Sequence, residues 1–252
     1  MKILISPAKK MRTDTDTLSP QALPAFLPET ERLLSALRSL SRQELKQLWR
    51  CSDAITDLNV ERLARMELGK GLTPALLSYQ GIQYQYMAPG VFETGQFTYL
   101  QEHLRILSAF YGIVRPFDSI QPYRLEMQCK LKVQDYNDLY AYWQDTLAKV
   151  LLKEVHTHKE NYLLNLSSKE YEKAIRPYIP KEQWIDVIFQ VEKKGKRKVE
   201  ATQAKMARGR MVHFLAQRQV ETLAEVYQFQ EDGYQLDKER TGNQQIVFYK
   251  KG

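Results

Sequence analysis

Two X–Pro bonds stiffen the segment from Tyr111 to Met127, which reads YGIVRPFDSIQPYRLEM, and they restrict the fold more than any other feature of the chain. Proline lacks a backbone N–H and disfavours helical geometry in the residue before it, so Pro116 and Pro122 exclude a regular helix here. The same segment carries two arginines, an aspartate, a glutamate and two tyrosines. We therefore expect a stiffened loop that holds charged and aromatic side chains in fixed positions.

Structural ion pairs offer another explanation of these charges. A pair between Arg124 and Glu126, or between Arg115 and Asp118, would tie a long loop to the rest of the protein without any ligand. The residues alone leave the structural and the functional explanations open.

Short apolar runs bounded by polar or turn-forming residues predict the strands of a central sheet. These runs span residues 3–5, 104–110, 162–166, 184–191 and 246–249. The turn at Lys194-Gly195-Lys196 would also let residues 198–201 pair with the strand over 184–191.

Apolar residues at helical spacing predict several helices between these strands. They form a block from residue 29 to about 68, a helix from Thr73-Pro74 to about Gly81, and helices over 138–158 and 204–220. Within the block, Ser41 followed by Glu44 is typical of a helix start. With 252 residues, of which 43% are hydrophobic, the chain can bury one sizeable core. We expect a single compact domain over 1–252 with a mixed α/β (α+β) fold and a helical block at about 29–82.

Three polar segments follow the ends of predicted strands, at residues 6–10, 115–130 and 167–171. Loops that leave the same edge of a sheet converge, and a rigid scaffold of this kind positions functional groups. The sequence therefore predicts one polar pocket built from these three segments.

Positive charge is concentrated towards the C-terminal part of the chain. The net charge is +7, and a positive surface attracts polyanions such as nucleic acid. The run KKGKRKVEATQAKMARGR, residues 193–210, holds eight lysines or arginines against the single acid Glu200. Lys205, Arg208 and Arg210 lie in a predicted helix, where they can neutralise phosphates, whereas the first part of the run is typical of a solvated hairpin tip.

The stretch CSDAITDLNVERLARME, residues 51–67, predicts two short helices that meet at a hairpin. Ser52 can cap the first helix, and Asn59, after a tight turn at Leu58-Asn59, can cap the second. A helix N-terminus in such a hairpin can present N–H groups to a phosphate. A plain connection between helices is the alternative, and the negative charge of Asp57 counts against a bound anion.

Signatures of metal sites, cofactors and membranes are absent from the sequence. His156 and His158 lie two residues apart without Cys or acidic partners at zinc spacing, so no metal site is predicted. Cys51 and Cys129 are too few for a disulfide framework, and no nucleotide-loop, metalloprotease or hydrolase motif suggests a cofactor. Because no apolar run approaches about 18 residues and the start does not read as a secretory signal, we expect a cytoplasmic protein without a membrane partner.

Five stretches resemble, in order along the chain, those of the YaaA peroxide-stress family. They are ISPAKKM (5–11), YQGIQYQYM (79–87), LRILSAFYGIVRPFDSIQPYRLEM (104–127), NLSSKEY (165–171) and AKMARGRM (204–211). The resemblance implies a cytoplasmic bacterial protein of the hydrogen peroxide response that keeps unincorporated iron low and limits oxidative damage. It also implies a single-domain α/β fold peculiar to the family, a helix-hairpin-helix element, a positively charged cleft and binding of double-stranded DNA.

The family motifs and their neighbours supply the candidate site residues. Those expected to bind nucleic acid or phosphate are Lys9, Lys10, Asn59, Arg62, Arg115, Arg124, Lys205, Arg208 and Arg210. Those expected to line the pocket are Ser6, Asn165, Ser168 and Tyr171. In the hairpin the family commonly has an Ala-Gly-Leu-Asn type of turn, whereas this chain has Thr56-Asp57-Leu58-Asn59, which weakens the expected phosphate contact.

Three functions are compatible with these features. The leading one is a peroxide-stress protein whose charged cleft binds duplex DNA with little sequence preference. The alternative is an enzyme that acts on a nucleotide or a damaged nucleobase, with Tyr123, Glu126 or Glu170 as the acid–base group. Direct iron binding through His156 and His158 is the least supported.

Overall fold

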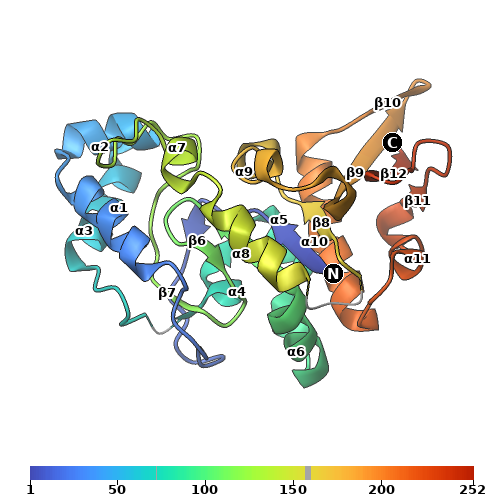
Figure 1. Ribbon diagram of the computed structural model, residues 1–252, viewed down its shortest axis with the longest axis horizontal. Helices are drawn as coiled ribbons and strands as arrows, with labels where there is room; N and C mark the ends of the chain where they lie inside the picture. The colour runs from blue at the N-terminus through green and yellow to red at the C-terminus, as the bar shows by residue number, and fades with distance from the viewer. Residues whose placement is uncertain (72, 157–159) are drawn as a thin grey trace.

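The computed structural model describes residues 1–71, 73–156 and 160–252 (Figure 1). At its centre is a mixed sheet whose strands follow the order β11 (Gln235–Leu236), β12 (Gln245–Lys251), β9 (Trp184–Lys193), β8 (Leu163–Leu166), β1 (Lys2–Ile5), β5 (Leu104–Ser108) and β6 (Gly112–Val114), with β10 (Lys196–Lys198) paired to β9. Strands β12, β9, β8, β1 and β5 are parallel to one another, and the other three pair antiparallel. The predicted mixed α/β fold is therefore confirmed.

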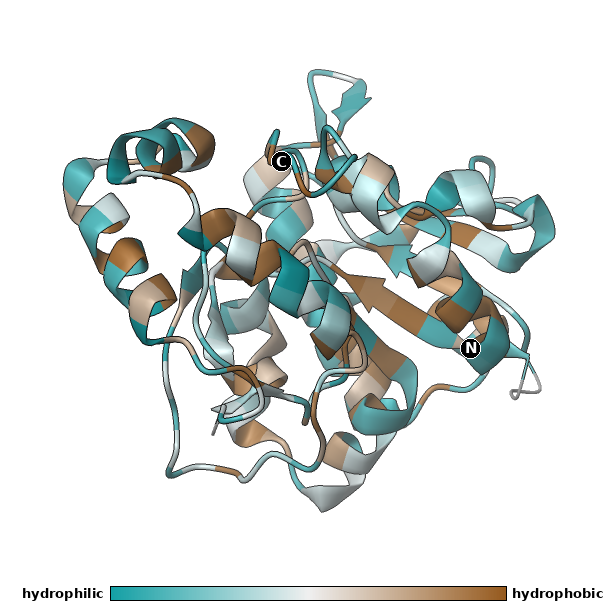
Figure 2. Ribbon diagram, turned by 60° about the vertical axis from the view of Figure 1, so that its left-hand side comes forward, coloured by the Kyte–Doolittle hydropathy of each residue, from teal (hydrophilic) through white to brown (hydrophobic). Residues whose placement is uncertain are grey.

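The middle strands are buried along their whole length because helices cover both faces of a parallel sheet. Every residue of β1, β5 and β8 is buried, and Figure 2 shows β1 as a hydrophobic strand that starts beside the N-terminus and runs through the middle of the molecule. In β9 buried residues alternate with more exposed ones, as its sequence pattern predicts. The hairpin after β9 also forms, but its paired residues are 196–198 rather than 198–201, because a helix begins at Ala201.

The order of the strands creates a topological switch beside β1. The chain leaves β1 for β5 and β6 on one side, and then returns to β8 on the other side of β1. In open sheets of this kind the loops that follow the two neighbouring strands separate and leave a crevice at the carboxyl ends of the strands. The fold thus prepares a crevice where the predicted polar segments begin.

Helices surround the sheet, and three of them form a block at the left of Figure 1. The helices are α1 (Leu27–Arg38), α2 (Arg42–Trp49), α3 (Asp53–Arg65), α4 (Ala75–Ser78), α5 (Ile82–Met87), α6 (Thr94–His103), α7 (Leu139–Trp143), α8 (Thr146–Val155), α9 (Lys169–Glu172), α10 (Ala201–Arg218) and α11 (Leu223–Val226). The block consists of α1, α2 and α3, and Ser41 with Glu44 forms the predicted capping box at the start of α2. Within the described ranges, no helix has both the length and the apolar character needed to cross a bilayer.

Two predicted helices are shorter or more broken than their periodicity indicates. Thr73–Pro74 is a short strand, β3, which pairs with β7 (Ser119–Ile120), and only the single turn of α4 follows it before β4 (Tyr79–Gln80) pairs with β2 (Lys10–Met11). The backbone N–H and C=O groups that a longer helix would use are instead hydrogen-bonded in these two short antiparallel ladders. The helix predicted over 138–158 is interrupted at Gln144, which has φ of 43°, and its last two residues lie outside the described ranges.

The predicted turn at Leu58-Asn59 is wrong, because both residues lie inside the continuous helix α3. Asn59 is buried, and its side-chain amide donates to the carbonyl of Ile55 one turn earlier at 2.8 Å, which suits a helix interior. The connection between α2 and α3 is instead the short stretch 50–52, where Ser52 stands at the predicted cap position without a side-chain cap bond. A phosphate contact by this helix pair stays a prediction.

Candidate functional site

A cavity of about 500 Å³ lies at the carboxyl ends of β1 and β8, and we call it the sheet-edge cavity. Its walls come from the loop after β1, the residues around the start of α5, the stretch before Met127, the start of α9 and one face of α10. The structure thus brings together residues from all three predicted polar segments, but of the second segment only residues 123–126 line the cavity. The predicted site residues that line the cavity are Ser6, Lys9, Lys10, Tyr123, Arg124, Glu126, Ser168, Glu170, Tyr171, Lys205 and Arg208.

Hydrogen bonds between the first residues after β1 and β8 fix the floor of the cavity. Ser6 Oγ accepts the backbone N–H of Ser168 at 2.8 Å and lies 3.2 Å from Ser168 Oγ. The hydroxyl of Tyr84 donates to the carbonyl of Ser6 at 3.0 Å. Because these contacts join strand ends that are distant in sequence, the two loops are held in one arrangement.

Asn165, predicted to line the pocket, instead lies buried in β8 behind the cavity wall. Its Oδ1 accepts the backbone N–H of Ser167 at 2.9 Å, and its Nδ2 donates to Asp186 at 2.8 Å. The side chain therefore fixes the turn that presents the next residue, Ser168, to the cavity. Asn165 is a positioning residue for the site.

Tyr123 closes the cavity at the end of β5. Its hydroxyl lies 2.7 Å from Ser108 Oγ and 3.0 Å from the hydroxyl of Tyr79, and its ring stacks on Phe110 at 5.0 Å between centroids. Burial raises the pKa of Tyr123 to about 12, so this hydroxyl stays protonated at neutral pH. Of the three acid–base candidates, Tyr123 is the least able to accept a proton.

Glu126 lies between two of the predicted phosphate-binding cations. Lys9 Nζ is 2.8 Å from Oε2 of Glu126, and Arg124 Nη2 is 2.7 Å from Oε1 in an ion-pair contact without hydrogen-bond geometry. The ion pair expected between Arg124 and Glu126 is therefore present, and it forms part of the cavity wall. These ion pairs can hold the loop in place, and the same residues can still belong to a binding site.

Glu170 is the second carboxylate of the cavity. Its Oε1 accepts the backbone N–H of Gln128 at 3.2 Å. Burial is the main reason that the pKa of Glu170 is raised, and the negative charge of Glu126 acts in the same direction. A carboxyl group whose pKa is raised can hold a proton and deliver it to a bound molecule.

Cations on α10 complete the site. Lys205 and Arg208 line the cavity, and the described residues offer neither side chain an ion pair. Arg208 is half-buried, its Nε is buried without a hydrogen-bond partner in the described chain, and burial lowers its pKa. Gly209 allows α10 to come this close, because a Cβ atom there would lie 2.2 Å from the backbone O of Gln83.

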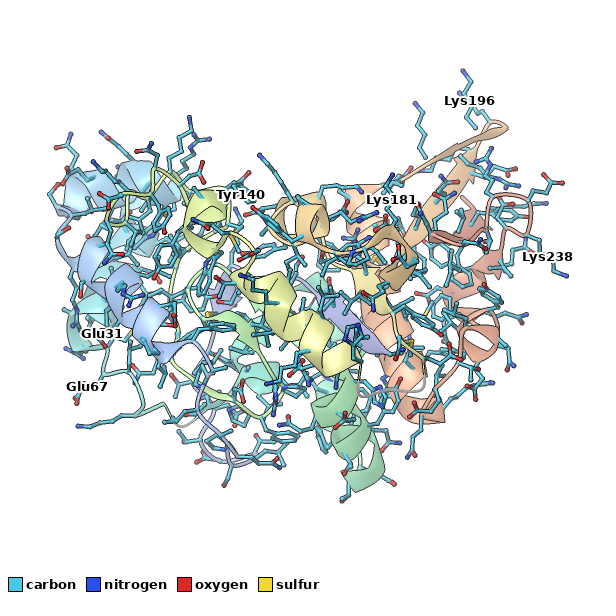
Figure 3. The ribbon with its side chains drawn as sticks, in the orientation of Figure 1. Glu31, Glu67, Tyr140, Lys181, Lys196 and Lys238 are labelled. Atoms are coloured by element: carbon cyan, nitrogen blue, oxygen red, sulfur yellow. The ribbon has the colours of Figure 1, made fainter. Side chains whose placement is uncertain are left out.

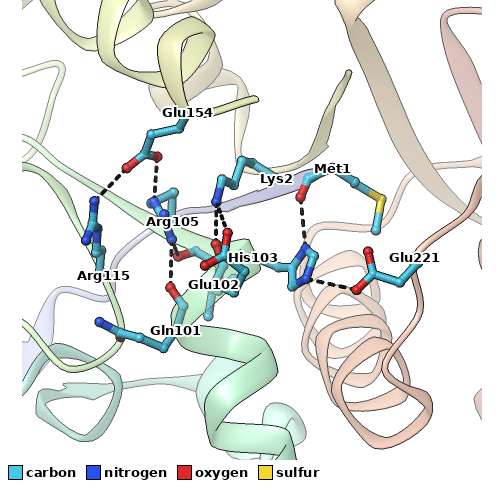
Figure 4. A network of polar contacts seen from close by, with 10 residues as sticks. Met1, Lys2, Gln101, Glu102, His103, Arg105, Arg115, Glu154 and Glu221 are labelled. Atoms are coloured by element: carbon cyan, nitrogen blue, oxygen red, sulfur yellow. Dashed lines mark hydrogen bonds and ion pairs between the residues drawn. The ribbon is translucent and has the colours of Figure 1, made fainter. Parts of the chain in front are cut away.

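Arg115 follows β6 and does not line the sheet-edge cavity, so a phosphate contact by this residue stays a prediction; Figure 4 shows it beside Glu154. Its guanidinium contacts Glu154 at 3.0 Å, beside Arg105, while Asp118 accepts only its backbone N–H. The reason is β6, which runs antiparallel to β5 and carries the chain back across the sheet before Arg115. The loop from 115 to 126 therefore starts at one edge of the sheet and reaches the cavity only at its end.

Three other predicted phosphate-binding residues also lie outside the cavity. Asn59 and Arg62 belong to α3, where Arg62 donates to the carbonyl of Met11 at 3.2 Å. Arg210 lies 3.3 Å from Asp232 and over the ring of Tyr86. Each of these side chains contacts another part of the protein and does not line the sheet-edge cavity.

The residues at the start of α5 form a wall for which the sequence analysis assigned no site role. They are Gln80, Gly81, Ile82, Gln83 and Tyr84, all within the stretch YQGIQYQYM. Gln83 is only 8% exposed, and its Nε2 has no hydrogen-bond partner in the described chain. The concentration of amide and aromatic side chains in this stretch is the signal that could have identified it.

No three His, Cys, Asp or Glu side chains of the described residues gather closely enough to hold a metal ion. His156 lies 3.0 Å from the side-chain amide of Gln183, and His158 is outside the described ranges.

Comparisons with known proteins identify the family to which the chain belongs. The family described as peroxide stress protein YaaA matches residues 1–240. A protein of Agathobacter rectalis named UPF0246 protein is 44% identical over 252 residues, covering 100% of this chain and 99% of the relative. Proteins with the same name from Pediococcus pentosaceus and Lactiplantibacillus plantarum are 45% and 46% identical, covering 99% and 98% of this chain and 98% of each relative. The chain therefore belongs to the YaaA peroxide stress protein family.

Proposed function

We propose that this member of a peroxide stress family binds double-stranded DNA through the cations of the sheet-edge cavity and its rim, with little sequence preference. The observation that carries the proposal is that five cations from three distant parts of the chain line one concavity, against two carboxylates. Contacts to phosphate position a protein on DNA without reading its sequence, so little base preference is expected.

The excess of positive charge in the cavity comes from three side chains. Glu126 already contacts Lys9 and Arg124, whereas Lys10, Lys205 and Arg208 form no ion pair with the described residues. These three cations are therefore available to a phosphate backbone. The family resemblance implies limits on free iron and on oxidative DNA damage, and on this proposal both are consequences of DNA binding. Finding stoichiometric iron in the purified protein would show instead that the protein binds iron directly.

Affinity for arbitrary duplexes should fall steeply with salt, because each phosphate contact releases counterions. Replacing Lys205 by glutamine should lower the slope of log affinity against log salt by about one for the lost contact. The slope is measured by fluorescence anisotropy at several salt concentrations. Lys238→Gln is the control, since Lys238 is exposed at the right of Figure 3 and does not line the cavity, and it should leave the slope unchanged. A duplex affinity that does not depend on salt would contradict the proposal.

Catalysis in the same cavity is a second candidate function, favoured by the different surroundings of its two carboxylates. Both oxygens of Glu126 contact cations, whereas burial raises the pKa of Glu170. A carboxyl group whose pKa is raised can donate a proton, and a second carboxyl group in the same cavity offers an acceptor. On this view Glu170 donates a proton and Glu126 accepts one from a nucleotide or a damaged nucleobase.

Replacing Glu126 by glutamine should abolish turnover, because the amide cannot accept the proton. Duplex affinity should rise in the same variant, since Lys9 and Arg124 lose the carboxylate that neutralises them. Turnover is assayed on a panel of nucleotides and of oligonucleotides with damaged bases, and duplex affinity by anisotropy. If the wild-type protein turns over no member of the panel, catalysis is rejected while DNA binding stands.

A further inference from the structure

We propose that the sheet-edge cavity holds one nucleotide unit, a nucleobase with its phosphate, either as a free mononucleotide or as a nucleotide turned out of a DNA strand. This inference deepens the proposed DNA binding, since it names the part of the nucleic acid that enters the protein. It concerns binding only and requires no chemical step.

The size and lining of the cavity fit such a unit. About 500 Å³ lies within the range of roughly 300–1,000 Å³ for pockets that enclose small ligands, whereas a duplex bound by its backbone lies on a surface. Ile82 and Leu125 give the cavity apolar surface, and Tyr84 and Tyr171 add aromatic rings. Both tyrosines are at most 5% exposed, so they shape the wall of the cavity and offer a base no open stacking face.

Buried donors in the cavity wall lack partners within the described chain. They are Gln83 Nε2, Arg124 Nε and Arg208 Nε. Most buried polar groups in native proteins are hydrogen-bonded, so three such donors around one cavity call for an explanation. Gln83 is more than nine-tenths buried and lines the cavity, which makes it the strongest of the three. A ligand rich in acceptors, as nucleobases and phosphates are, would satisfy them.

The ion pairs of the cavity indicate where each part of the nucleotide lies. Lys10, Lys205 and Arg208 form no ion pair with the described residues, although the charges of Glu172 and Asp186 act on Arg208, so we place the phosphate beside these three cations. Glu126 and Arg124 neutralise each other and offer an acceptor and a donor side by side. Such a pair suits the polar edge of a base, which carries both donors and acceptors.

A second cavity of about 380 Å³ shares Glu126 with the first and continues towards the helical block. Arg50 and Lys130 line it, and within the described ranges neither forms an ion pair. Arg50 also has φ of 47°, a left-handed conformation that favours glycine at the end of a helix. A strand that enters the first cavity could place its next phosphate beside these two cations, but Glu44 and Glu126 also line this cavity, so its charge does not decide between an extruded and a free nucleotide.

The first experiment measures binding of deoxynucleoside 5′-monophosphates, the corresponding nucleosides and inorganic phosphate by calorimetry. Mononucleotides should bind, nucleosides and phosphate should bind at least tenfold more weakly, and Arg208→Gln should weaken mononucleotide binding at least tenfold. Because Arg208 is half-buried and its replacement can perturb folding, the exposed Lys205→Gln serves as the second variant, with a severalfold loss expected. Lys238→Gln should bind mononucleotides as the wild type does.

The second experiment identifies the source of the nucleotide with a duplex that contains the fluorescent base 2-aminopurine. An extruded base leaves its stack, so fluorescence should rise on binding to the wild-type protein and less so with Lys205→Gln. If mononucleotides bind but the fluorescence of the duplex does not rise, the cavity holds a free mononucleotide and not a nucleotide extruded from DNA.

Two results would overturn the inference. One is that inorganic phosphate binds as well as mononucleotides do, which would make the cavity a simple anion site. The other is steep, salt-dependent duplex binding with neither mononucleotide binding nor a fluorescence rise, which would leave the proposed DNA binding intact. Mononucleotide binding without any duplex binding would instead reject the proposed function and keep the inference.

Discussion

Replacing Gly209 by alanine should destabilise the protein by about 2–3 kcal/mol, although alanine is the better helix former. In an open helix the change would stabilise by up to about 1 kcal/mol. Here the added Cβ atom would lie 2.2 Å from the backbone O of Gln83 and 2.9 Å from the backbone N of Met87. Backbone atoms of α5 cannot rotate away, so α10 and α5 must separate, and overpacking of this kind costs about 1–3 kcal/mol or more.

The loss is measured by chemical unfolding and by the midpoint of thermal unfolding, which should fall by roughly 5–10 °C for a chain of this size. Because α5 and α10 form two walls of the sheet-edge cavity, binding of any ligand there should weaken in parallel. Gly242→Ala is the matched control, since the space around Gly242 is open and its backbone is not left-handed. A variant at position 209 as stable as this control would show that the helices can move apart at little cost.

The site could be predicted from the sequence to the extent that it depends on the ends of parallel strands. The strands β1 and β8 read as short apolar runs, and each is followed at once by serine. Parallel strands end at the same edge of their sheet, so Ser6 and Ser168 had to lie near each other. The contact of 2.8 Å between Ser6 Oγ and the backbone N–H of Ser168 is the direct result.

The position of Arg115 could not be predicted because it depends on a strand of three residues. Residues 112–114 form β6, and a run this short carries no periodicity that distinguishes a strand from a loop. Gly112 has φ of +74°, and its missing side chain leaves room for Phe26 and Trp143, which allows the tight reversal after β5. One reversal then moves the following residues to the other edge of the sheet.

Local turn signals misled the prediction for residues 51–67 because tertiary burial decides this region. Asp57 and Asn59 are residue types that are common in turns. In the structure Thr56, Asn59 and Leu63 are buried at i, i+3 and i+7, which is one face of a continuous helix. Two polar residues on a buried face conceal the pattern that would otherwise indicate a helix.

Replacing Glu154 by leucine should destabilise the protein by about 3 kcal/mol, at the lower end of the loss when one partner of a buried ion pair is removed. Arg105 is only 3% exposed, and its Nε donates to Glu154 at 2.7 Å (Figure 4). Burial alone would raise the pKa of Glu154, but the hydrogen bond and charge of Arg105 outweigh it and lower the pKa. Without this carboxylate, the guanidinium of Arg105 stays buried beside Lys2, another buried cation.

The matched control removes the other partner of the same carboxylate. Arg115 contacts Glu154 at 3.0 Å but is half-exposed, so Arg115→Gln should cost no more than about 1 kcal/mol. Both variants are compared by guanidinium unfolding, and their duplex affinities should match that of the wild type, because neither residue lines the sheet-edge cavity. If the two variants lose equal free energy of unfolding, the burial of Arg105 is not the reason that Glu154 stabilises the protein. A fall in duplex affinity on Arg115→Gln would show instead that DNA reaches the opposite edge of the sheet.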